Sequence, residues 1–390
     1  MSLPSVGLYI HLPWCVQKCP YCDFNSHPLA QASLQSLPEQ DYLQALLADL
    51  AYEAERSGGV AVGSIFFGGG TPSLFSGSAI AAILEAVSHH FVLSGDAEIT
   101  LEANPGTVES TGFSEYRAAG VNRLSLGMQS FDDAMLEKLG RIHDAAESRA
   151  AFDKARHAGF DNINIDLMFG LPGQSGQAAL KDLQQGLELE PEHLSWYQLS
   201  IEPNTGFASQ PPALPADDVL DSMQTQGIAQ LTGQGYARYE VSAFSKTGRE
   251  CRHNLNYWRF GDYLGIGAGA HGKLTGPGAG GQVVRRMRQR HPRAYMQHAG
   301  GEGVILQEHA VTSDELLFEF LLNHLRLVDG FYLADMERLT GAAPLELQQM
   351  MQPVIEGGLL ALGRTHCRAT ERGFRFLNDI LLCALPATPI

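Results

Sequence analysis

The sequence predicts an α/β fold, in which a partial (β/α) barrel precedes a small C-terminal helical, winged-helix-like domain. Short β-rich runs alternate with helical patterns and recur roughly every 30 residues, as expected for parallel strands joined by crossover helices. The composition shifts near Gly300. Because 390 residues exceed the length that one core of about 250–300 residues uses, we expect two domains, 1–300 and 301–390.

The predicted barrel strands are rich in β-branched, aromatic and leucine residues. They cover residues 6–11, 64–67, 98–103, 123–129, 162–167 and 194–201. A helix is predicted between the first two strands, because apolar residues there fall on one face at helical spacing: Tyr42, Leu43, Leu46, Leu47 and Leu50. Another helix is predicted over 145–158, which is alanine-rich and free of proline and glycine.

The later part of the chain is less regular. A proline-rich stretch, 203–215, precedes a helical segment at 217–231, and a glycine-rich strand end follows at 264–272. Thr312 and Glu315 have the spacing of a capping box, which predicts the first helix of the second domain. Later helix-length segments and two short runs, 359–362 and 367–370, predict its winged-helix-like arrangement.

Charge and composition exclude several classes of protein. A formal net charge of −16 opposes contact with a phosphate backbone, so we expect no nucleic-acid partner. Acidic residues interrupt every apolar run well before the roughly 20 residues needed to cross a bilayer. The N-terminus lacks the basic and apolar segments of a secretory signal. We therefore predict a cytoplasmic protein without a transmembrane segment.

One basic cluster stands against this acidic background. Five arginines fall within nine residues: Arg285, Arg286, Arg288, Arg290 and Arg293. The cluster has two interpretations, a site for the carboxylates of a ligand or acidic partner, and a solvated loop.

Polar and glycine residues stand at or just past the ends of the predicted strands. They are Gly69, Gly70, Thr71, Glu102, Gln129, Asp166 and Ser200. Because the C-terminal ends of parallel strands form one rim, we expect these residues to meet at a single site.

Three cysteines, Cys15, Cys19 and Cys22, follow the first strand on one loop, whereas the other three are widely separated. A structural zinc site normally has four protein ligands. An iron–sulfur cubane held by three thiolates instead leaves one iron free for a further ligand. The spacing therefore predicts a [4Fe–4S] cluster, and the alternative zinc site needs a fourth ligand such as His11 or His27.

The C-x3-C-x2-C spacing, with Tyr21 before the last cysteine, resembles the motif of the radical S-adenosylmethionine (SAM) superfamily. This resemblance implies a radical SAM barrel in which the free iron binds the amino and carboxylate groups of SAM. It also implies that electron transfer cleaves the sulfonium to a 5′-deoxyadenosyl radical. The protein then supplies a polar cradle, an apolar slot for adenine and a dry site.

Further segments narrow the resemblance: 9–13, 68–72, 102–105, 127–131, 141–143 and 164–172. They are similar to the oxygen-independent coproporphyrinogen III oxidases and their relatives, the radical SAM heme chaperones, over nearly the whole chain. By similarity, the SAM contacts are Tyr9, Gly69, Gly70, Thr71, Glu102, Gln129, Arg141 and Asp166. Glycines admit a close ligand, Arg141 suits its carboxylate, and Glu102 and Asp166 suit hydroxyl or ammonium groups.

Two differences separate these branches. The family of oxidases that this sequence resembles carries the motif C-x3-C-x2-C-x-C, whereas this sequence has Phe24 at the position of the fourth cysteine. The oxidases also carry a long N-terminal extension, and this sequence has about five residues before its first strand. Both differences favour a heme chaperone that binds heme, the cluster and SAM and transfers heme to an acceptor protein. The alternative is an oxygen-independent coproporphyrinogen III oxidase, so enzymatic activity is left open.

Residues 252–258 match the H-N-x-x-Y-W motif of the chaperone branch, which makes His253 the leading axial heme ligand. A structural interpretation competes with it, in which His253 hydrogen-bonds nearby groups and the aromatic residues fill the core. His271, His291 and Cys251 are alternative ligands. A transient membrane-protein acceptor, another radical SAM activity such as methyl transfer, and a zinc-stapled scaffold are further hypotheses.

Overall fold

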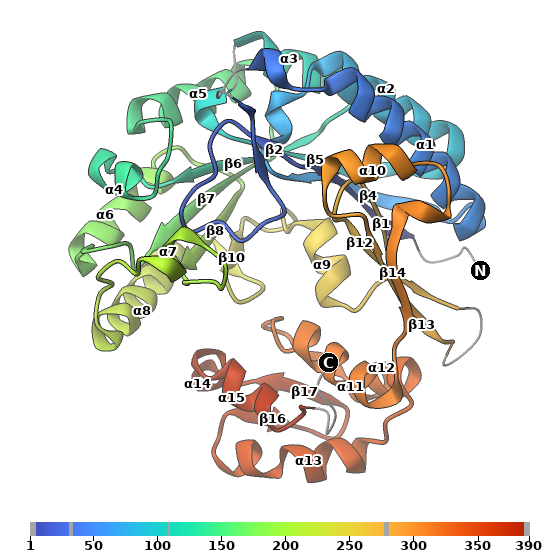
Figure 1. Ribbon diagram of the computed structural model, residues 1–390. Helices are drawn as coiled ribbons and strands as arrows, with labels where there is room; N and C mark the ends of the chain where they lie inside the picture. The colour runs from blue at the N-terminus through green and yellow to red at the C-terminus, as the bar shows by residue number, and fades with distance from the viewer. Residues whose placement is uncertain (1–4, 31–33, 108–109, 277–280, 386–390) are drawn as a thin grey trace.

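The computed structural model describes residues 5–30, 34–107, 110–276 and 281–385, and its main feature is a curved sheet (Figure 1). Twelve described strands pair in the order β14-β13-β12-β11-β1-β4-β5-β6-β7-β8-β10-β9. The central parallel strands are β1 (Val6–Leu12), β4 (Ala61–Gly69), β5 (Val92–Ala103), β6 (Arg123–Gln129), β7 (Ile163–Phe169), β8 (His193–Gln198) and β11 (Tyr263–Ile266).

Antiparallel strands extend the parallel part at both edges. One edge carries β9 (Ala237–Arg238) and β10 (Ala243–Ser245), and the other carries β12 (His271–Thr275), β13 (Val283–Arg288) and β14 (Ile305–Ala310). Since β9 and β14 do not pair, the sheet remains open, and the prediction of a partial (β/α) barrel is confirmed. The short strands β2 (Trp14–Cys15) and β3 (His27–Pro28) pair outside this sheet.

Crossover helices cover the convex face of the sheet (Figure 1). They are α1 (Glu39–Ser57), α2 (Gly77–His90), α3 (Ser110–Ala119), α4 (Asp133–Lys138), α5 (Ala145–His157), α6 (Gly176–Leu187) and α8 (Asp217–Gly233). Side-chain caps fix several starts, as in α5, where Asp144 and Glu147 form a capping box. Apolar faces of these helices, such as Ile80, Ile83 and Val87 of α2, pack on the fully buried strands and form the main core.

Three short helices lie off this layer: α7 (Gly206–Ser209), α9 (Arg252–Trp258) and α10 (Pro292–His298). Helix α9 contacts β1 and β4 close to where these strands begin, since its His253 bonds to Ser64. It therefore lies at the N-terminal ends of the strands, opposite the rim formed by their C-terminal ends.

The C-terminal part has its own hydrophobic core and three-stranded sheet. Its elements are α11 (Ser313–His324), β15 (Phe331–Tyr332), α12 (Leu333–Thr340), α13 (Pro344–Glu356), β16 (Leu360–Leu362), β17 (His366–Ala369), α14 (Glu371–Arg375) and α15 (Leu377–Leu382). The predicted capping box of Thr312 and Glu315 starts α11. This order of helices and strands is winged-helix-like. We propose two domains with a boundary after Ala310 instead of at 300, because β14 pairs with β13 in the large sheet.

Three of the five arginines in the cluster lie on a strand and not on a solvated loop, whereas Arg290 and Arg293 lie outside this strand and are exposed. Arg285, Arg286 and Arg288 lie on β13, where cross-strand and helical carboxylates pair with them. Arg288 is 1% exposed and lies 3.0 Å from Asp49 of α1. Arg286 bonds to Glu53 and Glu308. Sequence spacing does not reveal these partners, because they come from distant segments.

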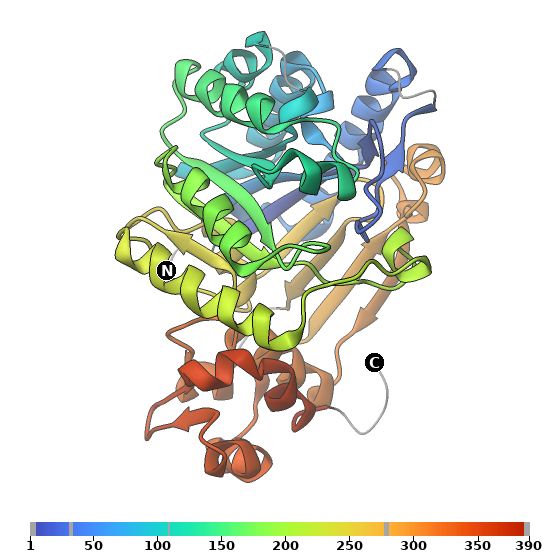
Figure 2. The ribbon, with the colours of Figure 1, turned by 90° about the vertical axis from the view of Figure 1, so that its left-hand side faces the viewer.

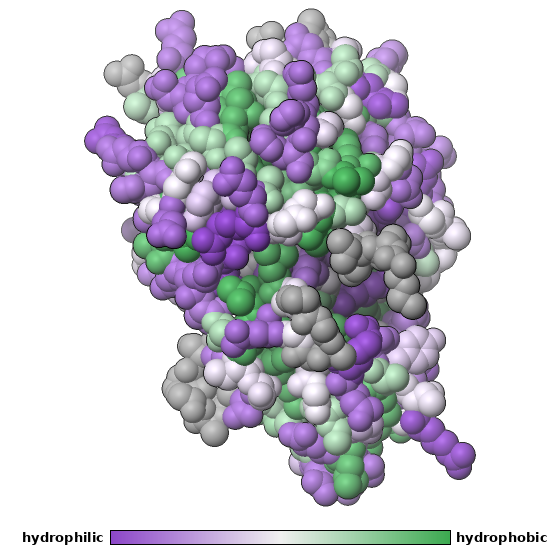
Figure 3. All heavy atoms as spheres, turned by 90° about the vertical axis from the view of Figure 1, so that its right-hand side faces the viewer, coloured by the Kyte–Doolittle hydropathy of each residue, from purple (hydrophilic) through white to green (hydrophobic). Residues whose placement is uncertain are grey.

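Figure 3 shows polar and apolar side chains interspersed over the face that carries these edge strands. Among the described helices, none is both long and apolar enough to cross a membrane.

Candidate functional site

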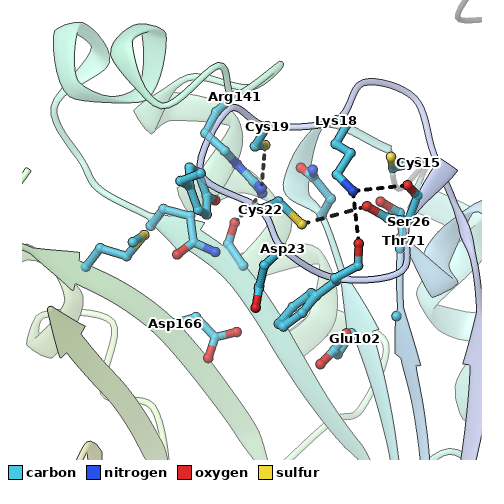
Figure 4. Close-up of a pocket in the computed structure, with 18 of the residues that line it drawn as sticks. Cys15, Lys18, Cys19, Cys22, Asp23, Ser26, Thr71, Glu102, Arg141 and Asp166 are labelled. Atoms are coloured by element: carbon cyan, nitrogen blue, oxygen red, sulfur yellow. Dashed lines mark hydrogen bonds between the residues drawn. The ribbon is translucent and has the colours of Figure 1, made fainter. Parts of the chain in front are cut away.

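The cysteine loop closes over the C-terminal ends of the parallel strands and encloses a cavity of about 380 Å³. Figure 4 shows the three cysteines on one side of the cavity and Glu102 and Asp166 on the other. Ten of the residues predicted for the cluster and SAM line it: Cys15, Cys19, Cys22, Gly69, Gly70, Thr71, Glu102, Gln129, Arg141 and Asp166. The structure thus brings together residues that are spread over 150 positions in the sequence.

Local hydrogen bonds shape the cysteine loop. Strands β2 and β3 pair on either side of it, and the Cys22 N–H donates to the Cys19 carbonyl at 3.1 Å, which forms a tight turn. All three thiols are free. No described group of three or more His, Cys, Asp or Glu side chains has the arrangement for a single metal ion. A cubane has a different requirement, because each thiolate binds a different iron.

His11 is a poor candidate for the fourth ligand of a zinc site. Its Nδ1 bonds to the Tyr9 hydroxyl at 3.0 Å and its Nε2 to the Asn25 carbonyl at 2.9 Å. Both ring nitrogens are therefore in use. Burial lowers its pKa to about 4, so the ring is neutral near pH 7.

Two glycines seat the end of β4 against the cysteine loop. A Cβ atom on Gly70 would lie 2.4 Å from the Trp14 carbonyl oxygen, and one on Gly69, whose φ is 120°, would lie 2.6 Å from the His11 ring. The Gly70 and Thr71 N–H groups donate to the Leu12 and Trp14 carbonyls at 2.8 and 2.7 Å. These glycines therefore permit close backbone packing beside Cys15.

Two carboxylates face the cavity from β5 and β7. Burial and the nearby Asp166 charge raise the pKa of Glu102 to about 8. Burial also raises the pKa of Asp166, although Asn164 and Ser125 donate hydrogen bonds to it at 2.9 and 3.1 Å. The Arg123 charge lowers the pKa of Asp166, but less than burial raises it, and neither carboxylate forms an ion pair with a described side chain. The pair favours a ligand with positive charge and hydrogen-bond donors, and SAM carries both.

Arg141 provides the opposite charge at the cysteine side. One guanidinium nitrogen donates to the Gly127 carbonyl at 2.7 Å and another lies 3.7 Å from the Cys19 sulfur. Its Nε is buried and has no hydrogen-bond partner among the described residues. A guanidinium with one unsatisfied N–H beside the cluster loop suits the carboxylate of an amino acid.

Gln129 has a strained backbone in the cavity wall. Its φ is 69°, a left-handed conformation that is rare for non-glycine residues and clusters at ligand sites. The Tyr197 hydroxyl donates to the Gln129 Oε1 at 2.8 Å, so the amide NH2 group of Gln129 can donate to another partner.

Several cavity residues were not predicted, among them Lys18, Asn104, Met168 and Tyr197. Tyr197 could have been predicted from the alternation of side chains along β8. The adjacent Trp196 packs into the core against Phe169, so Tyr197 points to the opposite face of the sheet. Lys18 donates to the Phe24 carbonyl at 3.0 Å, a contact within the loop that spacing does not indicate.

Two of the predicted site residues are not in the cavity lining. Tyr9 bonds to His11, and burial, together with the Glu102 charge, raises its pKa. His253 lies on α9 at the other end of the strands, where it is 1% exposed. Its Nδ1 bonds to Ser64 at 2.9 Å and its Nε2 to Tyr257 at 3.0 Å, and burial lowers its pKa to about 3. These contacts are the ones that the structural interpretation of His253 predicts, and an axial-ligand role stays a prediction.

The donor set fits both implied groups. Cys15, Cys19 and Cys22 would hold the cluster, and Arg141, Glu102 and Asp166 would hold SAM beside it. A cluster held there would supply an electron-transfer centre beside the bound SAM. The chain itself orients the ligand between opposite charges and limits access of water through the loop over the cavity.

The fold and this site define a radical SAM protein, and comparisons with known proteins agree. Residues 9–185 match the Radical SAM superfamily and residues 311–376 match the HemN C-terminal domain. The chain is 48% identical to the heme chaperone HemW of Escherichia coli and 47% identical to that of Haemophilus influenzae, over 97–98% of every chain. The chain belongs to the HemW family of radical SAM proteins.

A more distant structure shares the fold. The coproporphyrinogen III oxidase HemN of Escherichia coli superposes with a TM-score of 0.82 at 24% identity, covering 97% of this chain and 90% of the other. At this identity the match concerns the fold alone.

Proposed function

We propose that this protein is a heme chaperone, which binds heme, a [4Fe–4S] cluster and SAM and transfers the heme to an acceptor protein. The observation that carries the proposal is the identity of 48% to a named heme chaperone over 98% of both chains. Phe24 adds support, because it lines the cavity at the position of the oxidases' further cysteine and its surface is 61% exposed. We also propose that the protein works in the cytoplasm. Its heme acceptor is a protein of unspecified identity, and a membrane protein is one possible kind of acceptor.

Coproporphyrinogen III oxidation is the second candidate, and the fold shared with HemN favours it. An oxidase must bind the porphyrinogen next to the reactive end of SAM. The cavity here has a volume of about 380 Å³ and must already hold the cluster and SAM. This size favours the chaperone.

Two assays on the same cluster-loaded protein, kept anaerobic, separate the candidates. In the first, coproporphyrinogen III, SAM and a reductant are supplied and protoporphyrinogen is sought by fluorescence after oxidation. In the second, heme is titrated by Soret absorbance and the loaded protein is then mixed with an apo-hemoprotein. We expect stoichiometric heme binding and transfer without turnover. Multiple-turnover formation of protoporphyrinogen would contradict the chaperone proposal.

A further inference from the structure

A second cavity lies between the large sheet domain and the C-terminal domain. It has a volume of about 740 Å³, whereas three other cavities measure about 10, 210 and 220 Å³. Figure 2 shows α8 running above the C-terminal segment that holds β17 and α14, and residues of all three elements line this cavity. Of the five cavities compared, only this one has room for a large ligand in addition to the SAM site.

The floor of this cavity is apolar and its rim is basic. Ile228 of α8, Val328, Ala369 and Phe374 supply the apolar surface. Four arginines also line it: Arg238, Arg368, Arg372 and Arg375. Glu371 is the single acidic side chain in the described lining. This local excess of positive charge contrasts with the net charge of −16 of the whole chain.

The four arginines differ in how firmly they are held. Arg238 donates to the carbonyls of Glu240 and Val241, and its guanidinium lies 4.8 Å above the Phe374 ring. Arg375 forms an ion pair with Asp221. Arg368 and Arg372 are exposed and form no ion pair within the described residues. Arg372 donates one long hydrogen bond, at 3.4 Å, to the Gly357 carbonyl, so both guanidinium groups keep donors for an anionic ligand.

We propose that this interdomain cavity is the heme site, a proposal that rests on the chaperone function above. Heme has a flat apolar ring and two propionates, which match the apolar side chains of the lining and the two exposed arginines, Arg368 and Arg372. The described lining contains no His, Cys, Met or Tyr. The protein therefore holds the porphyrin by its ring and propionates and not by a ligand to iron, an arrangement that suits release to an acceptor with a stronger axial ligand.

This proposal makes a specific prediction about metal-free porphyrin. Full-length protein with its cluster is titrated with heme, with protoporphyrin IX and with protoporphyrin IX dimethyl ester. We expect heme and protoporphyrin IX to bind with affinities that agree within about threefold, and the ester to bind at least about tenfold more weakly. Binding of heme without binding of protoporphyrin IX would show that iron is ligated and would overturn the proposal.

Variants locate the site. The double variant Arg368→Gln/Arg372→Gln should weaken heme binding about tenfold or more. The variant Thr225→Trp, which fills the cavity from the exposed side of α8 without a change of charge, should weaken it similarly. Arg338→Gln/Arg364→Gln removes the same charge from the same domain away from the cavity and should leave the affinity unchanged. SAM affinity and iron content report that each variant is folded.

The outcomes separate this inference from the proposed function. If wild type binds heme and both cavity variants bind it equally well, the heme site lies elsewhere while the chaperone function stands. If wild type binds no heme in any state of its cluster, the chaperone function itself fails.

Discussion

At the residue scale, the protonation state of Glu102 links SAM binding to pH. Its pKa of about 8 means that the carboxyl group is mostly neutral at pH 7, and a cationic ligand binds the charged form better. SAM affinity should therefore fall as pH drops below 8, by up to about tenfold per pH unit. Calorimetry between pH 6.5 and 9 measures this slope.

The matched variants for this test are Glu102→Gln and Glu137→Gln. The first removes the titrating group and should flatten the pH profile, whereas the second replaces an exposed carboxylate of α4 and should keep it. A steep profile that persists in Glu102→Gln would assign the proton to another group.

We expect His253 to contribute to the stability of the folded protein and not to heme binding. Its ring joins Ser64 of β4 to Tyr257 of α9 and stacks on Phe66 at 5.1 Å between ring centroids. His253→Ala should lower the free energy of unfolding by about 2–4 kcal/mol, from a lost buried ring and unpaired hydroxyl groups. The heme Soret band of the folded variant should be unchanged.

Chemical denaturation and heme titration of the same sample test both parts. His309→Ala, at an exposed position of β14, serves as the control. A variant of His253 that keeps wild-type stability and loses the Soret band would restore the axial-ligand hypothesis.

The pH dependence has a defined sign at this residue. With a folded pKa of about 3, His253 stays neutral in the native state, while the unfolded chain gains a proton below about pH 6.5. Its contribution to stability is therefore complete above pH 6.5 and decreases toward pH 3, by about 1.4 kcal/mol per pH unit.

At the element scale, a buried ion-pair network joins α1, β13 and α10. Arg288 bonds to Asp49 and Glu53, and the Tyr295 hydroxyl donates to Asp49 at 2.9 Å. Arg288→Gln would leave two buried carboxylates without a cation and should cost about 3–5 kcal/mol. Arg293→Gln, at an exposed position of α10, should cost less than about 0.5 kcal/mol. Equal denaturation midpoints for the two variants would contradict this account.

Element boundaries show what local sequence encodes and what it does not. The strand predicted at 123–129 and the helix at 145–158 agree with β6 and α5 within a residue. The prediction of 98–103 missed the first half of β5, since Val92–Ala97 contains Gly95 and Asp96 and pairs only through tertiary contacts with β4. The partners of the β13 arginines were not predicted either, because Asp49 and Glu53 lie more than 200 positions away and Glu308 and Glu319 come from the separate elements β14 and α11.

At the scale of the whole molecule, the strand-end rule predicted which residues meet at one cavity. Residues such as Glu102 and Asp166 meet because parallel strands end at one rim, and that follows from the alternation of strands and helices alone. The exclusion of His253 from the cavity did not follow from its motif. It depends on α9 packing at the start of β1 and β4, which only the tertiary structure reveals. The interdomain cavity was equally hidden, because residues from α8, β9, β17 and α14 form it jointly.

The joint between β14 and α11 has a mechanical consequence. Two residues separate these elements, and both are fastened: the Val311 N–H donates to the Val283 carbonyl at 2.9 Å, and Thr312 caps α11. A hinge needs backbone that is free to rotate, and both residues of this connection are held by hydrogen bonds. The two lobes should therefore turn as one body, with the gap between them held at constant width.

Inserting Gly-Ser-Gly-Ser between Val311 and Thr312 tests this rigidity. The insertion should broaden the distance distribution between spin labels on α8 and α14 and weaken heme binding, with SAM affinity unchanged. A distribution already broad in wild type would contradict a rigid joint. If the joint is rigid, cargo cannot be expelled by a swinging lobe. The heme must then leave through the opening of the interdomain cavity, to an acceptor protein bound beside that opening.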